Sequence, residues 1–324
     1  MEQVLKIDNL KTSFMTSNGE VQAVRGVSFS VEKGEILGIV GESGSGKSVT
    51  CMSILKLLAD TARIKEGSIY FEGEDLTKIS KKKLRKVRGE KISMIFQDPM
   101  SSLNPLIPVG KQVAEMMAEH HPEKKPEQMK EEVLELFRKV RIPEPEKRYK
   151  CYPHEFSGGM RQRVMIAMAM ICRPKLLIAD EPTTALDVTI QAQVLDILQK
   201  LQRENGTALI LITHDLSVVA HMADRVYVMY CGKIVEHAPL RDLFTHPKHP
   251  YTQGLLSSVP HLSADSNRFV QIPDNVPSPL KKPHGCYFHT RCSYCTQECT
   301  ECMPRLTDIG PDRQLRCHHP LGGE

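Results

Sequence analysis

The 324-residue sequence contains no tryptophan and no apolar run long enough to cross a lipid bilayer. Its longest apolar run, residues 164–172, is far shorter than the ~20 residues that a membrane helix needs. The first residues also lack the basic and apolar regions of a signal peptide. We therefore expect a chain without membrane spans in a reducing compartment, where its ten cysteines do not form a disulfide framework.

The composition is that of an ordinary globular protein, with 40% hydrophobic and 25% charged residues. The net charge of +4 is too small to indicate nucleic-acid binding by itself. The length allows one large α/β domain and something smaller, and we find no internal repeat. The cysteines are unevenly distributed, because six of the ten lie near the end of the sequence: Cys286, Cys292, Cys295, Cys299, Cys302 and Cys317.

Residues 41–48 match the phosphate-binding loop pattern G-x-x-x-x-G-K-S/T at every fixed position. An apolar run at 35–40 predicts a buried strand that enters this loop, and residues 47–58 predict a helix that leaves it. A dinucleotide-binding loop is excluded, because Val49 stands where that pattern requires its third glycine. The sequence therefore predicts a P-loop between a strand and a helix.

The residue types of the loop suit a nucleoside triphosphate. Glycines allow backbone N–H groups to surround an anion, and the following helix directs its positive N-terminus at the phosphates. Lys47 would contact the β- and γ-phosphates, and Ser48 would bind Mg²⁺. We expect ATP to contact the whole loop: Gly41, Ser43, Gly44, Ser45, Gly46, Lys47, Ser48 and Val49.

Alternating strand and helix patterns predict an α/β fold with a mostly parallel sheet. Residues 3–14 and 21–31 indicate an antiparallel β lobe around a turn at 17–20. Further strands are expected at 68–71, 92–96, 176–179, 208–212 and 225–230. Helices are expected at 109–119, 126–140, and 188–204 with Asp187 as its N-cap. An apolar stripe in the second helix indicates a helical subdomain, about residues 98–175, inserted into the core.

The Lys- and Arg-rich stretch at 78–91 is interpreted as a solvated helix face. Contact with anionic lipid headgroups or nucleic acid is the alternative.

Acidic and amide side chains follow several of these strands, where the carboxyl ends of parallel strands meet. Asp180 could hold Mg²⁺, and Glu181 could polarise a water molecule against the γ-phosphate. Gln97 could contact Mg²⁺ and water, and His214 could bind the γ-phosphate. Asp180, Glu181 and His214 each have a purely structural alternative, such as a solvated strand end. Phe14 could stack on a purine ring or simply pack in a core.

At this point the chain resembles the ATP-binding cassette (ABC) ATPases. Residues 156–163 are similar to the signature motif of that family, and the motifs around them occur in the family order. The resemblance covers about residues 1–260. It implies that Asp180 and Glu181 form Walker B, residues 184–187 the D-loop with Asp187, and Gln97 the Q-loop. It also implies that His214 is the switch histidine, and that Phe14 stacks on adenine.

The signature motif implies a dimer. Ser157, Gly158 and Gly159 open an expected helix at 158–172, whose N-terminal amides form a second anion site. In the family this site serves the P-loop of another cassette, so a second ATPase subunit, identical or different, is implied. Met160 departs from the glutamine that many members carry, at a variable position.

Residues 95–105 and 249–252 are similar to the Q-loop region and a later motif of oligopeptide/dipeptide permease ATPases. The resemblance implies an ATPase at the cytoplasmic face of the inner membrane that energises uptake of di- or oligopeptides. Its partners would be two transmembrane permease subunits and an extracytoplasmic solute-binding protein, with no nucleic acid. Nickel or oligosaccharide import, or a soluble ABC ATPase outside transport, remains the alternative.

The cysteine spacing of the tail is compatible with a four-thiolate zinc site, through Cys292, Cys295, Cys299 and Cys302, or with an iron–sulfur cluster. The resemblance favours the second, because the C-terminal extension of peptide-permease ATPases has four recurring cysteines. These correspond to Cys286, Cys292, Cys299 and Cys317, and in some members they bind a 4Fe-4S cluster. Zn²⁺ is the alternative. We expect a nucleotide-binding domain at 1–246 and an extension at 247–324.

Overall fold

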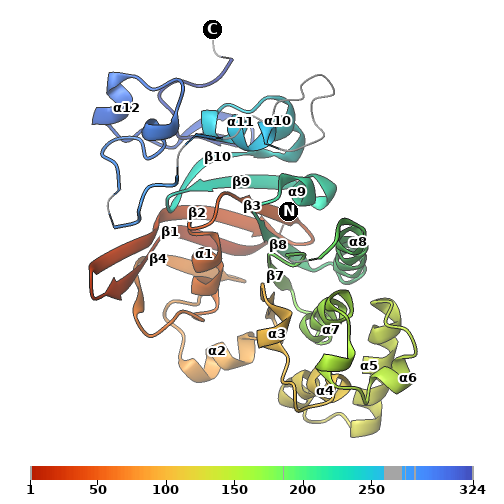
Figure 1. The fold of residues 1–324 in the computed structure, drawn as a ribbon. Helices are drawn as coiled ribbons and strands as arrows, with labels where there is room; N and C mark the ends of the chain where they lie inside the picture. The colour runs from red at the N-terminus through yellow and green to blue at the C-terminus, as the bar shows by residue number, and fades with distance from the viewer. Residues whose placement is uncertain (1, 185, 259–271, 274, 281, 323–324) are drawn as a thin grey trace. The chain divides into compact units, whose positions relative to one another are not determined.

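The computed structural model describes residues 2–184, 186–258, 272–273, 275–280 and 282–322 (Figure 1). These residues form two compact units. The helical unit consists mainly of residues 78–211, with short pieces from 1–4 and 31–35. The P-loop unit is drawn from residues 5–30, 36–77 and 212–324. The predicted α/β class, with an antiparallel lobe and an inserted helical region, is confirmed.

The antiparallel lobe is a four-stranded sheet of order β2-β1-β4-β5. Its strands are β1 (Gln3–Thr16), β2 (Gly19–Glu32), β4 (Ala62–Phe71) and β5 (Glu74–Asp75). β4 begins at Ala62, well before the predicted start at Ser68, because β1 pairs with it as far as Phe14 opposite Ala62. Pairing along the long β1 strand overrides the charged residues that end the sequence pattern.

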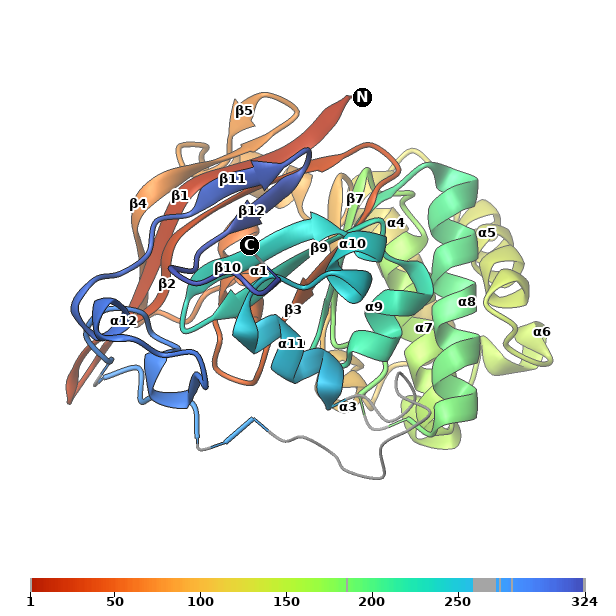
Figure 2. The same ribbon diagram turned by 90° about the horizontal axis from the view of Figure 1, so that it is seen from above.

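The P-loop unit also contributes the strand order β11-β12-β10-β9-β3. These strands are β3 (Ile36–Val40), β9 (Arg225–Tyr230), β10 (Lys233–Pro239), β11 (Thr307–Gly310) and β12 (Arg313–Leu315). β3 and β9 are parallel, whereas β10 pairs antiparallel with both β9 and β12. Figure 2 shows β11 and β12 beside β10. The sequence did not predict β10, β11 or β12.

The helices of this unit are short: α1 (Lys47–Ile54), α9 (Leu216–Met222), α10 (Leu240–Thr245), α11 (Pro250–Ser257), the 3₁₀ turn η2 (His289–Arg291) and α12 (Gln297–Glu301). The predicted end of α1 at residue 58 is wrong. Lys56 adopts a left-handed φ of 49°, and Leu57 N–H donates to the carbonyl of Met52 at 2.9 Å, which closes the helix.

The helical unit contains the strand order β8-β7-β6, built from β6 (Ile92–Ile95), β7 (Leu176–Asp180) and β8 (Ala208–Thr213). β6 and β7 are parallel, and the chain passes into the P-loop unit within β8. Its helical segments are α2 (Lys81–Val87), α3 (Pro99–Ser102), α4 (Val109–His120), α5 (Pro126–Lys139), α6 (Pro145–Arg148), the 3₁₀ turn η1 (Pro153–Glu155), α7 (Gly158–Met170) and α8 (Val188–Asn205).

The inserted helices pack as the apolar stripe predicts. Met129, Val133, Leu136, Phe137 and Val140 are all buried, and Figure 1 shows α4, α5 and α7 side by side. On α2, only Leu84 and Val87 are buried, so its basic residues form an exposed face. Within the described ranges, no helix is both long and apolar enough to span a membrane.

Candidate functional site

The P-loop of the P-loop unit has the strand and helix that its sequence predicts. The fully buried β3 enters it, and α1 leaves it at Lys47. Gly46 has a φ of 100°, and a Cβ at this position would lie 2.5 Å from the carbonyl oxygen of Ala23. Only glycine fits such a left-handed and crowded position. The loop conformation is therefore fixed by the backbone around it.

Lys47 is buried inside the curve of the loop. Its Nζ donates to the carbonyls of Gly41 at 2.6 Å and Glu42 at 3.0 Å, and to Ser45 Oγ at 3.4 Å. The loop is tied to its surroundings by Gly232 N–H, which donates to Ser45 O at 2.9 Å. The buried Lys47 ammonium, held by these oxygen atoms, provides a positive charge for an anionic ligand.

The outer residues of the loop are accessible. Ser43 and Gly44 are exposed, whereas Ser48 and Val49 are half-buried at the start of α1. Phe14 is half-buried on β1, opposite Ala62. Its partial exposure is compatible with both interpretations, stacking on a purine ring and packing in a core.

His214 lies directly after β8 and is exposed. The residues on either side of it are fixed, because Asp215 N–H donates to Thr213 Oγ1 at 3.0 Å. Asp215 in turn caps α9 by accepting from Ser217 N–H at 2.8 Å. The predicted position of His214 at a strand end is confirmed.

In the helical unit, Gln97 and Glu181 come together as the carboxyl-edge prediction requires. Gln97 Nε2 donates to Glu181 Oε2 at 2.9 Å, and Thr184 Oγ1 donates to the same oxygen at 2.8 Å. Asp180 is buried at the end of β7, and Glu181 follows with a left-handed φ of 47°. Such a φ is costly for a non-glycine residue and is concentrated at functional sites. Two neutral donors thus orient the Glu181 carboxylate without neutralising it.

The signature residues present a helix N-terminus to solvent. Ser157 caps α7, accepting from Met160 N–H at 3.4 Å, and both Ser157 and Gly158 are exposed. A Cβ on Gly159 would lie 2.5 Å from Ile190 Cγ2, so α7 and α8 approach closely there. The predicted helix at 158–172 is confirmed, although it ends at Met170.

Asp187 caps α8 as predicted, and its side chain accepts from Ile190 N–H at 3.0 Å. Asp187 itself is exposed. Ala185, part of the same D-loop stretch, lies outside the described residues.

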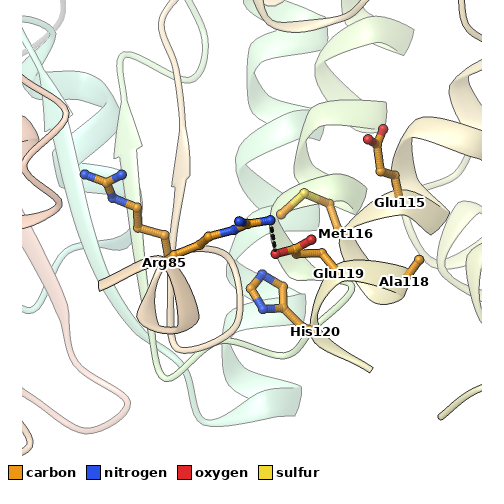
Figure 3. Close-up of a pocket in the computed structure, with 7 residues that line it drawn as sticks. Arg85, Glu115, Met116, Ala118, Glu119 and His120 are labelled. Carbon is orange, nitrogen blue, oxygen red and sulfur yellow. Dashed lines mark ion pairs between the residues drawn. The ribbon is translucent and has the colours of Figure 1, made fainter. Parts of the chain in front are cut away.

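A hollow of about 460 Å³ lies between α2 and α4 (Figure 3). Arg85 Nη2 and Glu119 Oε1 form an ion pair of 2.8 Å across it. Both side chains are substantially exposed, so this pair contributes little to stability. The hollow is lined by Arg85, Arg88, Glu115, Met116, Ala118, Glu119 and His120.

The tail cysteines fall into two groups by exposure. Cys299 is buried and Cys286, Cys292 and Cys317 are half-buried, whereas Cys295 and Cys302 are exposed. Cys286 N–H donates to the carbonyl of Cys299 at 2.8 Å.

A series of hydrogen bonds through Thr296 and His319 connects two of the four more buried cysteines, Cys299 and Cys317. Thr296 Oγ1 lies 3.7 Å from Cys299 Sγ and 2.7 Å from His319 Nε2. Cys317 Sγ donates to the carbonyl of His319 at 3.3 Å.

Burial, followed by the electrostatic influence of Cys299 and Cys292, raises the pKa of Cys286 to about 11. Burial also raises the pKa of Cys317 to about 11, and Cys286, Cys292 and Cys299 act on it in the same direction. In the absence of a bound metal, the thiols of Cys286 and Cys317 are therefore protonated at neutral pH. Among the described residues, no group of three or more His, Cys, Asp or Glu side chains is arranged to hold a metal ion.

Two residues that contact the P-loop were not assigned to it from the sequence. Tyr251 Oη accepts from Glu42 N–H at 2.8 Å, and the Arg291 guanidinium binds the Glu42 carboxylate. Both lie more than 200 positions from Glu42, so no local pattern could have revealed them.

Comparison with known proteins gives consistent results. Residues 24–184 match the family described as ABC transporter, and residues 235–299 match the C-terminal region of oligopeptide/dipeptide transporters. The oligopeptide transport ATP-binding protein of Escherichia coli (strain K12) is 50% identical over 320 residues, covering 99% of this chain and 94% of its own. The dipeptide transport ATP-binding protein of Bacillus subtilis (strain 168) is 50% identical over 318 residues, covering 98% and 95%.

Solved structures agree on the fold. The dimeric structure of a bacterial ABC transporter cassette has a TM-score of 0.66 and 28% identity, covering 73% of this chain and 99% of that one. A dimeric post-hydrolysis cassette bound to ADP and phosphate has a TM-score of 0.66 and 27% identity, covering 73% and 99%.

Proposed function

Because this chain belongs to the ATP-binding subunits of oligopeptide and dipeptide ABC transporters, we propose specific residue roles for its ATPase activity in a peptide importer. The chain hydrolyses ATP and energises peptide uptake. The observation that carries the residue assignment is the buried Lys47, held by the carbonyls of a glycine-rich loop at a helix N-terminus.

In the P-loop unit, Lys47 binds the β- and γ-phosphates, and the amides of residues 41–49 surround them. Ser48 supplies a hydroxyl ligand for Mg²⁺, and His214 contacts the γ-phosphate. Phe14 stacks on the adenine ring. The burial of Lys47 supports its role, since a phosphate neutralises a charge that water does not reach.

In the helical unit, Glu181 is the general base that takes a proton from the attacking water. Gln97 and Thr184 orient its carboxylate through the two hydrogen bonds to Oε2. Asp180, at the end of β7, supplies an acidic group for Mg²⁺, with Gln97 as a further ligand. Mg²⁺ would neutralise phosphate charge as the terminal phosphoryl group leaves.

The chain works in an importer complex and forms dimers of cassettes, like its relatives. We propose that the N-terminus of α7, at Ser157, Gly158, Gly159 and Met160, binds the ATP held by the P-loop of the second ATPase subunit, because its first two residues are exposed. Asp187 is exposed at the N-terminus of α8, which approaches α7 at Gly159 and Ile190, and it would contact that partner.

The permease subunits require a docking surface, and the hollow between α2 and α4 is our candidate for it. It lies in the helical unit, and its two arginines and two glutamates offer complementary charges to a helix of a permease subunit. Two such membrane subunits and an extracytoplasmic solute-binding protein would complete the importer. The chain would then sit peripherally at the cytoplasmic face of the inner membrane.

Reversing the charge of Arg85 should test this surface. We expect Arg85→Glu to lower ATP-dependent peptide uptake by at least about tenfold, because like charges now face each other at the docking surface. ATP hydrolysis by the isolated chain should be unchanged. The matched control is Lys82→Glu, an exposed change on the same helix outside the hollow. Equal uptake by the two variants would contradict the docking assignment.

We propose that Cys286, Cys292, Cys299 and Cys317 hold a 4Fe-4S cluster. Their partial burial, the backbone bond between Cys286 and Cys299, and the bonds of Thr296 support this set over Cys295 and Cys302. These four residues would supply the four thiolates that such a cluster requires. The cluster would act as a structural staple for the extension, residues 247–324, beside a nucleotide-binding domain at 1–246.

The transported substrate can be tested with the assembled importer in lipid vesicles. We expect labelled di- and oligopeptides to accumulate with Mg²⁺ and ATP, and not with a non-hydrolysable ATP analogue. Accumulation of nickel or an oligosaccharide without peptide would instead favour the alternative import substrates.

A further inference from the structure

Glu42, in the P-loop, forms hydrogen bonds through its N–H, its carbonyl and its carboxylate, to residues both near to it and far from it in the sequence of the P-loop unit. Its backbone N–H donates to Tyr251 Oη at 2.8 Å, and its carbonyl accepts from Lys47 Nζ at 3.0 Å. Its carboxylate accepts two bonds from Arg291, Nη1 to Oε2 at 2.7 Å and Nη2 to Oε1 at 3.0 Å. A single residue therefore links Arg291 to the lysine that binds phosphate.

The Arg291 side chain is fixed by burial and by further hydrogen bonds. It is only 2% exposed, compared with 28% for that of Glu42. Its Nε donates to the carbonyl of Pro273 at 2.8 Å, and Nη1 also donates to Tyr230 Oη at 3.3 Å. A bidentate pair of this kind fixes geometry, because the planar fork of arginine matches both carboxylate oxygens. This pair is oriented and largely buried, unlike the exposed pair between Arg85 and Glu119.

Aromatic packing supports the same connection. Tyr230 and Tyr251, both fully buried, lie 4.7 Å apart between ring centroids. Phe288 packs on both, at 5.3 Å from each, with an edge-to-face arrangement on Tyr230. Such ring pairs stabilise beyond their buried area. Phe288 and Arg291 therefore bring the cysteine-rich tail against the residues that support the P-loop.

The segment that carries Phe288 and Arg291 is enclosed by two cysteines. Arg291 N–H donates to Phe288 O at 2.9 Å, which closes the turn η2 between Cys286 and Cys292. The carbonyl of Cys286 accepts from His289 Nδ1 at 2.8 Å. Whatever fixes these two cysteines therefore also fixes the position of the Arg291 side chain.

We propose that Arg291 is a positioning residue that couples the cysteine-rich tail to the P-loop, so that ATP affinity depends on the Arg291–Glu42 pair. This inference rests on the proposed binding of ATP at Lys47. Arg291 does not touch the nucleotide; it holds Glu42, whose carbonyl holds Lys47. Without the pair, the loop also adopts conformations that cannot bind phosphate. The apparent affinity for ATP then falls in proportion to the fraction of chains that remain competent to bind it.

The test is MgATP binding to the full chain, followed by steady-state ATP hydrolysis in the importer. We expect Arg291→Gln to raise the MgATP Kd and KM by about tenfold, with kcat changed by less than about twofold. Arg291→Lys should recover part of the affinity, because a lysine keeps the charge and loses the fork. The matched control is Arg305→Gln, an exposed arginine of the same tail, which should bind ATP like wild type.

A double-mutant cycle separates coupling from general destabilisation. Glu42→Gln should weaken binding about as much as Arg291→Gln, and the double variant should be no weaker than either alone. Additive effects, or Arg291→Gln binding like Arg305→Gln, would overturn the proposal. If Arg291→Gln does not fold, Glu42→Gln, at a more exposed position, tests the same pair. If wild type itself fails to bind MgATP, the proposed function fails instead.

Discussion

Replacing Glu181 by glutamine should lower the kcat of ATP hydrolysis by about 10³-fold while leaving MgATP binding intact. Glutamine keeps the shape of the side chain and its bonds from Gln97 and Thr184, but it cannot accept the proton of the attacking water. The isosteric change also leaves the left-handed backbone at this position undisturbed. The measurement is phosphate release by the assembled importer, with nucleotide binding measured in parallel.

A trapped dimer should accompany the lost turnover. Because the Glu181→Gln chain binds ATP without hydrolysing it, we expect an ATP-dependent dimer by size-exclusion chromatography. The matched control is Glu131→Gln, an exposed change on α5 that should hydrolyse ATP like wild type. Turnover by Glu181→Gln within about tenfold of wild type would remove Glu181 from the role of general base.

The second large effect concerns the tail. Chain purified without oxygen should contain about four iron atoms and four sulfides, and Cys299→Ser should reduce the iron to below about one. Cys299 is the most buried of the proposed ligands, and its carbonyl accepts from Cys286 N–H, so the backbone holds it beside a second proposed ligand. If the tail holds a cluster that stabilises its fold, Tm should also fall by roughly 5 °C or more in this variant.

The exposed cysteines provide the control for this result. Cys302→Ser should keep its iron, its visible absorption and its Tm, because its side chain lies outside the more buried set. One zinc ion per chain, lost in both Cys299→Ser and Cys302→Ser, would instead assign the tail to the set Cys292, Cys295, Cys299 and Cys302.

The parts of the site that depend on nearby residues could be predicted from the sequence. The P-loop pattern, the Asp187 cap and the strand end at Asp180 each involve only a few consecutive residues. The proximity of Gln97 to Glu181 followed from one general rule, that parallel strands end at the same edge, whereas the hydrogen bond between them did not. Thr184 was included in the D-loop stretch, but nothing in its sequence showed that its hydroxyl binds Glu181.

The parts that could not be predicted depend on distant partners. β10 lacks an apolar strand pattern because Glu236 and His237 interrupt it, yet both are buried. Glu236 is satisfied by the N–H groups of Lys248 at 2.7 Å and His249 at 2.9 Å, which no local pattern encodes. Arg291 and Glu42 are 249 positions apart. Their pairing follows from the tertiary fold, and only coordinates reveal it.

The pairing of β12 with β10 has a consequence for biosynthesis. β10 leaves the ribosome long before β12, and until β12 arrives it presents an open edge of backbone N–H and C=O groups. Open edges of this kind are templates for pairing with other chains. We therefore expect chaperones to bind a nascent chain that is stalled between these strands. A premature stop codon in the tail should yield aggregates rather than a shorter, active ATPase.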